Sequence, residues 1–600
     1  MANTATESIV LPRRHLALLY LSIFLLSFAV RTLTWQDNHN DAWKVQTSVT
    51  ARYKESGRQL VAKDFKRFVS DVPRLGHPPG YPILIGTIYA LAGESDSIVQ
   101  LIQITIDSAA VVVLSLIALE MFQQLSIAIL TGVLAALSPQ FAYFSVLLLP
   151  DSLVVLPVLL SIYFIVRSRR HYRLSSFLIS GALIGLSCWL RANALLLPLF
   201  LAALAVLVVP RGKRLSAALT IIAGAILVVA PITIKNAVVF HRFIPLSLGT
   251  GQTLLEGIAD YDEHNRFNIP KTDLGLQRQE ADWFSKPSYA DGLFNEDGIE
   301  RDRMRDARGF QIIRSHPLWF MTVVFKRALA STRLDPVPRL LRESPVSHPL
   351  DTSKPPIWQN TPIELMRGER SAKANFSLVD DTWLRISSDD EPYGHQLTSE
   401  LIRVEPFNDY VLRMPLKLEQ GRVNVRVTSG ERQVVLGSLV ADVTEGVDPN
   451  DQSTKQLTLP FVSARNSTVR LAIANNASGH STMLVGTPRL IQLGPSSFTW
   501  LRYVRMPLRV LQRVFTTAWI LPFILIGIGV LICKRRWQEL AILLAVPAYY
   551  LCVQSALHTE RRYVYVIHFF FLVLVGVALC WILKTVRGFV IRSGRNNADA

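Results

Sequence analysis

Residues 174–210 read LSSFLISGALIGLSCWL, then Arg191, then ANALLLPLFLAALAVLVVP. Basic clusters close this stretch on both sides, at 169–173 and 211–214. Positive charge of this kind marks the cytoplasmic loops of membrane proteins, and about twenty apolar residues are needed to cross a bilayer as a helix. The stretch therefore predicts a pair of membrane helices, with Arg191 at the break between them on the face opposite the basic loops.

The composition agrees with a polytopic membrane protein that also carries sizeable soluble parts. Of its 600 residues, 50% are hydrophobic and only 18% are charged. The net charge of +17 falls in short clusters between apolar runs, which is the pattern of membrane topology, so we exclude nucleic acid as a partner. A disulfide framework and a CxxC metal site are excluded because the four cysteines lie in or beside apolar segments: Cys188, Cys533, Cys552 and Cys580.

Ten apolar segments are long enough, or nearly long enough, to cross a membrane. They run at about 15–35, 98–120, 125–149, 150–168, 174–190, 192–210, 214–233, 516–533, 538–556 and 563–583. The first has no small-residue cleavage site after it and is interpreted as an uncleaved anchor. Five basic clusters agree on one threading, which places 36–97, 138–151, the break at Arg191 and 234–515 on the outer face. The short apolar stretch 78–93 fits a re-entrant or interfacial helix.

The chain divides into four predicted regions. Residues 1–235 form a transmembrane module with an outer loop at 36–97, and 236–345 form a helical juxtamembrane region on the outer face. Residues 365–493 alternate apolar and polar side chains between turn residues, which predicts a β-sandwich of jelly-roll type. Such a module can bind carbohydrate or serve only as structure, and both alternatives stay open. Residues 500–600 form further transmembrane helices and a basic cytoplasmic tail.

Three carboxylates are predicted to face outward: Asp37, Asp41 and Asp151. Charge near hydrocarbon is costly, so acids at a membrane face indicate a function, although solvated loop residues are the simpler alternative. A sugar transfer needs a base for the acceptor hydroxyl, and Asp41 with Asp151 as its partner would supply it. An Mg²⁺ or Mn²⁺ ion shared by Asp41 and Asp151 is an optional part of this hypothesis.

Cationic side chains collect at the predicted outer ends of helices. An anionic leaving group such as phosphate is well matched by the planar fork of arginine. For any single arginine, an interfacial anchor or a contact to a lipid headgroup is the alternative. The candidates for phosphate binding are Arg191, Lys235, His558, Arg561 and Arg562.

Several short motifs occur in one order along the chain. They are Asp41 with Tyr53 and Gly57 after it; His77-Pro78-Pro79-Gly80-Tyr81-Pro82; Ser138-Pro139 through Pro150-Asp151-Ser152-Leu153; Gly181 to Arg191; Ala230-Pro231-Ile232-Thr233-Ile234-Lys235-Asn236; and His558-Thr559-Glu560-Arg561-Arg562-Tyr563. In this order the chain resembles the GT-C superfamily of integral-membrane glycosyltransferases, in the branch with the protein O-mannosyltransferases and the lipid A aminoarabinose transferases. The resemblance covers about 15–330 and 500–585, and the β-rich stretch falls outside it.

The resemblance implies a GT-C-like helical fold of about ten or more transmembrane helices, into which the β module is inserted. It implies an inverting glycosyltransferase that takes a sugar from polyprenyl or dolichyl phosphate and transfers it to a lipid, glycan or protein acceptor. Asp41 would be the base, with Asp37 as the alternative because Ala42 stands where the family often has glutamate. Tyr563 would join the phosphate-binding residues, and His77 and Tyr81 would contact substrate. The setting would be the outer face of a bacterial inner membrane, or the ER membrane in a eukaryote.

Two other classes compete with an enzyme. A transporter or channel would line a path between helices with its charges, but the polar groups here collect on one face and few lie within helices. A non-catalytic adhesion or sensory protein would display the β module, but one anchor helix would be enough for that purpose.

Overall fold

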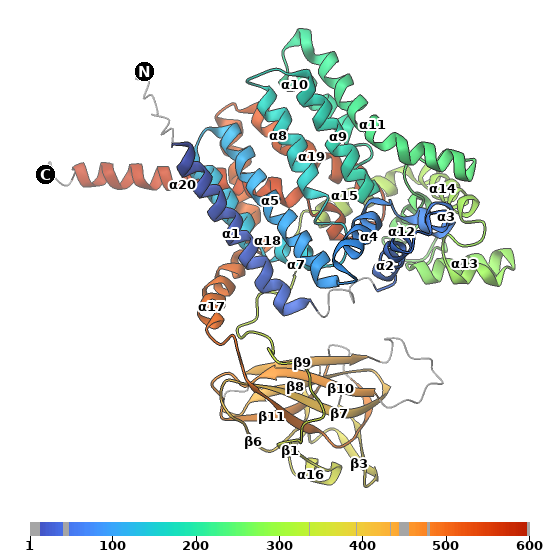
Figure 1. Cartoon of the computed structure of the whole chain (residues 1–600), viewed down its shortest axis with the longest axis vertical. Helices are drawn as coiled ribbons and strands as arrows, with labels where there is room; N and C mark the ends of the chain where they lie inside the picture. The colour runs from blue at the N-terminus through green and yellow to red at the C-terminus, as the bar shows by residue number, and fades with distance from the viewer. Residues whose placement is uncertain are drawn as a thin grey trace. The chain divides into compact units, whose positions relative to one another are not determined.

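The computed structural model describes residues 12–39, 47–334, 336–389, 391, 393–431, 434–442, 455–476 and 480–596. The chain forms two compact units. The helical unit comprises Met1–Arg339 and Val510–Ala600, and the β-rich unit comprises Leu340–Arg509. Figure 1 shows both units and labels many of their helices and strands.

Within the described residues of the helical unit, five helices are long and apolar enough to cross a membrane. They are α1 (Arg13–Asn38), α5 (Asp96–Phe122), α11 (Arg214–Phe240), α19 (Trp537–Val553) and α20 (Ile567–Asn596). The number becomes seven if two bent helix pairs each count as one span: α6 (Leu125–Leu137) with α7 (Pro139–Val146), and α17 (Leu501–Leu511) and η6 (Gln512–Val514) with α18 (Thr517–Cys533). Four shorter apolar helices are α4 (Gly80–Ala92), α8 (Val155–Ser168), α9 (Leu174–Leu190) and α10 (Leu197–Val208). Among the described residues, a helical protein with five to seven candidate membrane spans is confirmed, and about ten crossings stays a prediction.

Two predicted helix boundaries were wrong, both at prolines. The expected single segment 125–149 bends by 52° at Ser138-Pro139, between α6 and α7. The segment expected to end near residue 233 continues through Pro231 to Phe240, so Lys235 lies inside α11 and does not follow it. Prolines are tolerated within apolar helices when nearby groups satisfy the freed carbonyls. Beside the Leu227 carbonyl, which loses its usual donor at Pro231, the Val228 carbonyl accepts a hydrogen bond from the indole nitrogen of Trp189 at 2.8 Å.

Helices α9 and α11 pack backbone against backbone (Figure 1). A β-carbon added to Gly181 of α9 would overlap the carbonyl oxygen of Ile221 in α11. A β-carbon on Gly224 of α11 would in turn meet the carbonyl oxygen of Leu178. Small residues allow this approach between membrane helices, where dispersion contacts supply much of the association energy. Arg191 directly follows the last residue of α9, so this contact between the helices also fixes the position of Arg191 in the candidate site.

Replacing Gly181 with alanine should destabilise the protein. The added methyl group meets backbone, which cannot rotate away, and overpacking typically costs about 1–3 kcal/mol. Gly529→Ala in α18 is the matched control, because nothing lies within 4 Å of its added β-carbon. Thermal unfolding in detergent should show a lower midpoint for Gly181→Ala only. Equal midpoints for the two variants would contradict the close contact.

A buried ion pair joins α1 and α5 to the segment before α20. The Nε atom of Arg31 lies 2.6 Å from Oδ2 of Asp107, and both side chains are fully buried. The hydroxyl of Tyr565 donates to the other carboxylate oxygen at 2.9 Å. Because an unpaired charge in this position would be very costly, the three segments are held in one arrangement.

Shorter helices complete the helical unit. Near the N-terminus they are α2 (Thr47–Val61), α3 (Phe65–Ser70) and η2 (Val72–Gly76). After α11 come α12 (Thr250–Ala259), α13 (Asp273–Phe284), η5 (Pro287–Asp291), α14 (Gly298–Ser315) and α15 (Pro317–Ser331). Buried Glu280 of α13 holds α14 through Arg301 and Arg305, each at 2.6 Å. The single-turn segments are η3 (Ala192–Ala194), η4 (Arg211–Lys213), η7 (Gln554–Ala556) and η8 (Arg561–Val564).

The β-rich unit contains two antiparallel sheets, so the predicted β-rich stretch is confirmed (Figure 1). The seven-stranded sheet has the order β1-β13-β7-β12-β4-β3 with β10 on β7, and the six-stranded sheet has the order β2-β5-β11-β8-β9 with β6 on β11. Alternate residues of both sheets enter one hydrophobic cluster, for example Leu412 and Met414 from one and Val425 and Ile473 from the other. The strands are β1 (Trp358–Gln359), β2 (Glu369–Arg370), β3 (Asn375–Asp380), β4 (Trp383–Ser387), β5 (His395–Thr398), β6 (Ile402–Arg403), β7 (Asn408–Gln420), β8 (Arg422–Ser429), β9 (Val435–Asp442), β10 (Lys455–Val462), β11 (Thr468–Asn475), β12 (Thr482–Val485) and β13 (Arg489–Pro495), with α16 (Pro362–Leu365) between β1 and β2.

Candidate active site

Asp151 and Arg191 form an ion pair at the centre of the candidate site. Asp151 lies in the turn after Pro150, between α7 and α8, and Arg191 lies where α9 ends in extended backbone. The Oδ1 atom of Asp151 accepts hydrogen bonds from Nη2 of Arg191 at 2.6 Å and from Nε at 2.9 Å. The side chains are only 4% and 15% exposed, respectively. The second carboxylate oxygen of Asp151 is buried and has no hydrogen-bond partner in the described part of the chain.

Tyr563 connects this pair to a second arginine. The guanidinium of Arg191 lies over the Tyr563 ring at 4.3 Å, and that of Arg562 lies 5.0 Å from the same ring. Arg562 is 7% exposed and pairs with Glu560 at 2.7 Å, while its Nη1 atom is buried without a partner among the described residues. The Asn193 side chain donates to the Tyr563 carbonyl at 3.0 Å, which joins η3 to η8. Arg191, Arg562 and Asp151 thus form one buried cluster around Tyr563.

Tyr53 and His77 adjoin this cluster from the N-terminal side. Their rings lie 5.2 Å apart, and Tyr53 also makes an edge contact with Tyr81 at 5.0 Å. Burial lowers the pKa of His77 to about 3, and the positive charges of Arg191, Arg52 and Arg562 act in the same direction. Burial also raises the pKa of Tyr53 to about 12. At neutral pH, His77 is therefore an uncharged hydrogen-bonding group and not a cation for phosphate.

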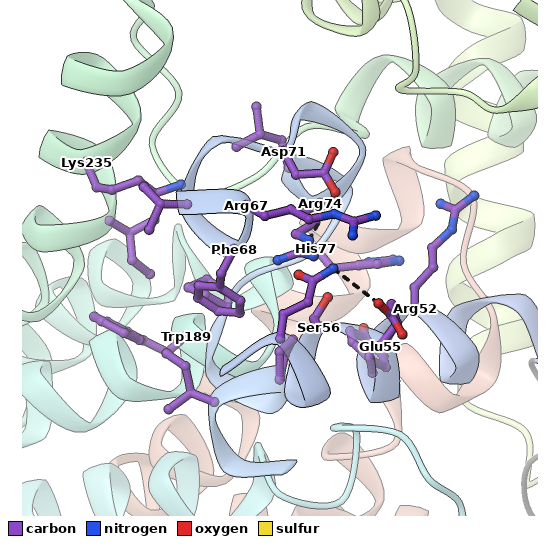
Figure 2. A pocket seen from close by; sticks show the side chains of 18 of the residues that line it. Arg52, Glu55, Ser56, Arg67, Phe68, Asp71, Arg74, His77, Trp189 and Lys235 are labelled. Carbon is purple, nitrogen blue, oxygen red and sulfur yellow. Dashed lines mark hydrogen bonds and ion pairs between the residues drawn. The ribbon is translucent and has the colours of Figure 1, made fainter. Parts of the chain in front are cut away.

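A cavity of about 560 Å³ opens beside His77 and Tyr53. Figure 2 shows Trp189 and Lys235 on one side of it, and Arg52 and Glu55 on the other. Its cations are Arg52, Arg67, Arg74 and Lys235; its acids are Glu55 and Asp71; and its apolar wall includes Phe68, Ile83, Trp189, Pro231 and Ile232.

The polar side of this cavity has unused hydrogen-bonding capacity. Gln59 is 6% exposed, and its side-chain carbonyl oxygen has no partner among the described residues. The Nη1 atom of Arg74 is also buried without a hydrogen-bond partner there, although its Nε atom lies 3.2 Å from Asp71. Buried polar atoms without partners are costly, so this side is suited to a polar ligand.

The structure brings together some of the predicted residues and separates others. Asp151, Arg191, Arg562, Tyr563 and His77 form the cluster, and Lys235 lines the cavity next to it. Tyr81 is fully buried, and its hydroxyl donates to Gln103 at 2.7 Å. His558 lies against α12 instead, where its Nδ1 atom is 2.8 Å from Asp260. Arg561 lies in η8, and Asp37 lies in the last turn of α1.

Asp41, the predicted base, lies outside the described residues, so its position stays a prediction. A divalent cation shared by Asp41 and Asp151 also stays a prediction, because Asp41 lies outside the described residues. Arg191 already neutralises Asp151, and Arg562 lies beside the same tyrosine. Across the described ranges, no group of three His, Cys, Asp or Glu side chains could hold a metal ion.

Sequence analysis did not identify the α2 face of the cavity. Arg52, Ser56 and Gln59 follow a spacing of four and then three residues, which places them on one side of a helix. That periodicity was a usable signal in the sequence. The contribution of α3 and η2, through Arg67 and Arg74, has no comparable sequence pattern.

Arg191→Gln should destabilise the protein strongly, because it leaves the Asp151 carboxylate buried without a counter-charge. Breaking one side of a buried pair typically costs about 3–5 kcal/mol. Arg58→Gln is the matched control, since Arg58 pairs with Glu94 at 2.6 Å but is 47% exposed, and exposed pairs contribute about 0–1 kcal/mol. Unfolding midpoints in detergent distinguish the two. If both variants lower the unfolding midpoint by a similar small amount, the ion pair of Arg191 with Asp151 is effectively solvated.

Three of the solved structures that are similar to this chain share little sequence identity with it. An arabinose-bound MgGH51 α-L-arabinofuranosidase has 14% identity and a TM-score of 0.18, over 25% of this chain and 27% of its own. A CBM4 structure has 12% identity and a TM-score of 0.18, over 25% of this chain and 94% of its own. Arabinosyltransferase EmbB from Mycobacterium smegmatis has 12% identity and a TM-score of 0.21, over 70% of this chain and 60% of its own. Curated protein sequences give no match.

Residues 76–234 match the family described as dolichyl-phosphate-mannose-protein mannosyltransferase. The matched segment contains His77, Asp151 and Arg191. The helical unit thus contains a segment that is similar to a glycosyltransferase family. The resemblance to the GT-C superfamily, in the branch with the protein O-mannosyltransferases, is confirmed over these residues.

Proposed function

We propose that this protein is an inverting glycosyltransferase that moves a sugar from a polyprenyl-phosphate carrier, or from dolichyl phosphate in a eukaryote, to an acceptor on the outer face of the membrane. The supporting observation is the cavity of about 560 Å³, in which cations face an apolar wall. A lipid phosphate is amphiphilic in the same way. The matched glycosyltransferase segment forms part of this wall through Trp189, Pro231 and Ile232.

The cations of the cavity would bind the donor phosphate. Arg52 and Arg67 line the cavity and form no ion pair within the described residues. Arg74 keeps one unpaired nitrogen, and Lys235 approaches from the apolar side. Charge-assisted hydrogen bonds to phosphate are stronger than neutral ones, and partial burial strengthens them further. The isoprenoid tail would then lie along Trp189 and Ile232, toward the apolar helices α9 and α11.

The reaction would be a single displacement. The acceptor hydroxyl oxygen attacks the anomeric carbon, and the bond from that carbon to the phosphate oxygen breaks with its electron pair going to the phosphate. Asp41 accepts the hydroxyl proton, with Asp37 as the alternative base. Asp151 would act by holding Arg191, whose charge stabilises the negative charge that develops on the phosphate. One displacement inverts the configuration of the anomeric carbon.

Arg67→Gln should weaken the binding of polyprenyl phosphate about 10-fold or more, because a charge-assisted contact contributes roughly 1.5–3 kcal/mol. Lys66→Gln changes the neighbouring cation, which does not line the cavity, and should leave the affinity within about twofold, since a distant exposed charge is largely screened. Binding is measured on nanodisc-embedded protein by microscale thermophoresis. If wild type and Arg67→Gln bind polyprenyl phosphate with equal affinity, this cavity is not the phosphate site.

Asp41→Asn should abolish most turnover, since the amide cannot accept the acceptor's proton at neutral pH. A general base contributes about 10²–10⁴-fold, so transfer should fall by that factor while donor affinity stays near wild type. Asp37→Asn is measured beside it. If Asp41→Asn keeps more than about a tenth of the wild-type rate, Asp41 is not the base, and a collapse in Asp37→Asn would assign the role there.

We also propose the finer topology that the sequence predicts. Helices α8, α9 and α10 and the two bent helix pairs would cross the membrane together with the five long helices, which gives ten crossings, while α4 would be re-entrant or interfacial. The two sheets of the β-rich unit, which share one hydrophobic cluster, would form a jelly-roll-like sandwich.

A further inference from the structure

A second cavity, of about 380 Å³, lies within the β-rich unit. Along β7, the even-numbered residues Leu412 and Met414 enter the hydrophobic core, so Arg413 and Pro415 point to the opposite face of the sheet. The cavity lies on that opposite face, over β10, β7 and β13. The segment 352–356 and the turn at Gly486-Thr487 border it.

The base of this cavity holds an unusual pair of charges. Arg413 of β7 and Arg489 of β13 are direct cross-strand partners in the antiparallel register. Like charges directly opposite each other destabilise a sheet. Neither arginine forms an ion pair with a carboxylate of the described residues, and the Nε atom of Arg413 is buried without a hydrogen-bond partner there.

The rest of the lining adds a third cation and no acid. Lys354 lines the cavity, and its amino group also donates to the Leu493 carbonyl at 2.7 Å. Within the described part of the chain, no aspartate or glutamate lines this cavity. Two arginines without a carboxylate partner among the described residues, with a lysine beside them, indicate an anionic ligand.

An aromatic ring and neutral polar side chains lie beside the three cations of this cavity. Trp383, the first residue of β4, is half-buried at the cavity, so part of its ring is available for contact. Thr382, Thr487 and Gln456 supply hydroxyl and amide groups around it. A sugar ring offers C–H groups that pack on an indole and hydroxyls that bond to such side chains. An acidic peptide offers the charge without the ring.

We infer that this cavity binds an acidic glycan, an oligosaccharide that carries carboxylate or phosphate groups. An anionic group placed between Arg413 and Arg489 relieves their repulsion and provides an acceptor for the buried Nε atom, while the neighbouring sugar ring packs against Trp383. The volume lies within the range of about 300–1,000 Å³ that is usual for ligand pockets. The inference concerns the β-rich unit alone and does not depend on the proposed transfer reaction.

The test measures binding of three probes to the full-length protein in nanodiscs by isothermal titration calorimetry. Tetragalacturonate should bind at least 10-fold more tightly than maltotetraose, which has no charge, and tetraglutamate, which has no sugar ring. Arg489→Gln and Trp383→Ala should each weaken tetragalacturonate binding at least 10-fold. Arg385→Gln is the matched control, because Arg385 lies on the same sheet face, pairs with Glu419 at 2.6 Å and does not line the cavity.

Several results would overturn the inference. They are no binding of tetragalacturonate, equal binding of either comparison probe, or unchanged binding by Arg489→Gln and Trp383→Ala. Arg489→Gln should also unfold at the same or a higher temperature than wild type, because it removes the repulsion. If Arg489→Gln unfolds at a lower temperature, Arg413→Lys replaces it in the test. Arg413→Lys keeps the positive charge but loses the planar guanidinium, so it should bind tetragalacturonate at least 10-fold more weakly than wild type. Wild-type affinity in Arg413→Lys would then reject the site.

Discussion

The ion pair between Asp151 and Arg191 is the constraint on which the candidate active site depends. It joins the turn after α7 to the break after α9, and Tyr563 extends the connection to η8. Taking two charges out of water is costly, and only a short, well-aligned pair offsets that cost. The pair therefore tolerates little displacement of either segment. Segments separated by hundreds of residues acquire one fixed geometry around it.

Both sides of the large cavity are held by close packing between helices. On the apolar side, Gly181 packs directly on the backbone of α11, and the indole nitrogen of Trp189 donates to the Val228 carbonyl at 2.8 Å. On the polar side, Gly57 of α2 packs against Gly86 of α4, where a β-carbon added to Gly86 would lie 3.0 Å from the Gly57 carbonyl oxygen. Close backbone packing of this kind cannot relax, whereas exposed ion pairs such as that of Arg58 with Glu94 contribute little to stability. The backbone contacts therefore fix both walls of the cavity.

The sequence predicted the helical membrane fold, the β-rich stretch and the Arg191 break, because hydropathy, alternation and basic clusters are local signals. It also placed Asp151, Arg191 and Arg562 on one face of the membrane, through the basic clusters and the predicted helix ends. It did not predict that Asp151 pairs with Arg191, since pairing depends on how distant segments pack. Nor did it place Lys235 correctly, because the apolar segment was expected to end near residue 233 and the helix in fact continues to Phe240. Arg67 and Arg74 enter the cavity from short helices whose positions follow only from tertiary structure.

The cationic side of the large cavity has a consequence for the catalytic cycle. In a transfer from a lipid phosphate, the departing carrier keeps both its isoprenoid tail and its phosphate, so the side chains that capture the donor hold the spent carrier as well. The spent carrier has even gained a negative charge, and the cations should retain it more firmly than they held the donor. Escape of the spent carrier into the bilayer would then set the turnover rate, and its accumulation would inhibit the enzyme in competition with fresh donor.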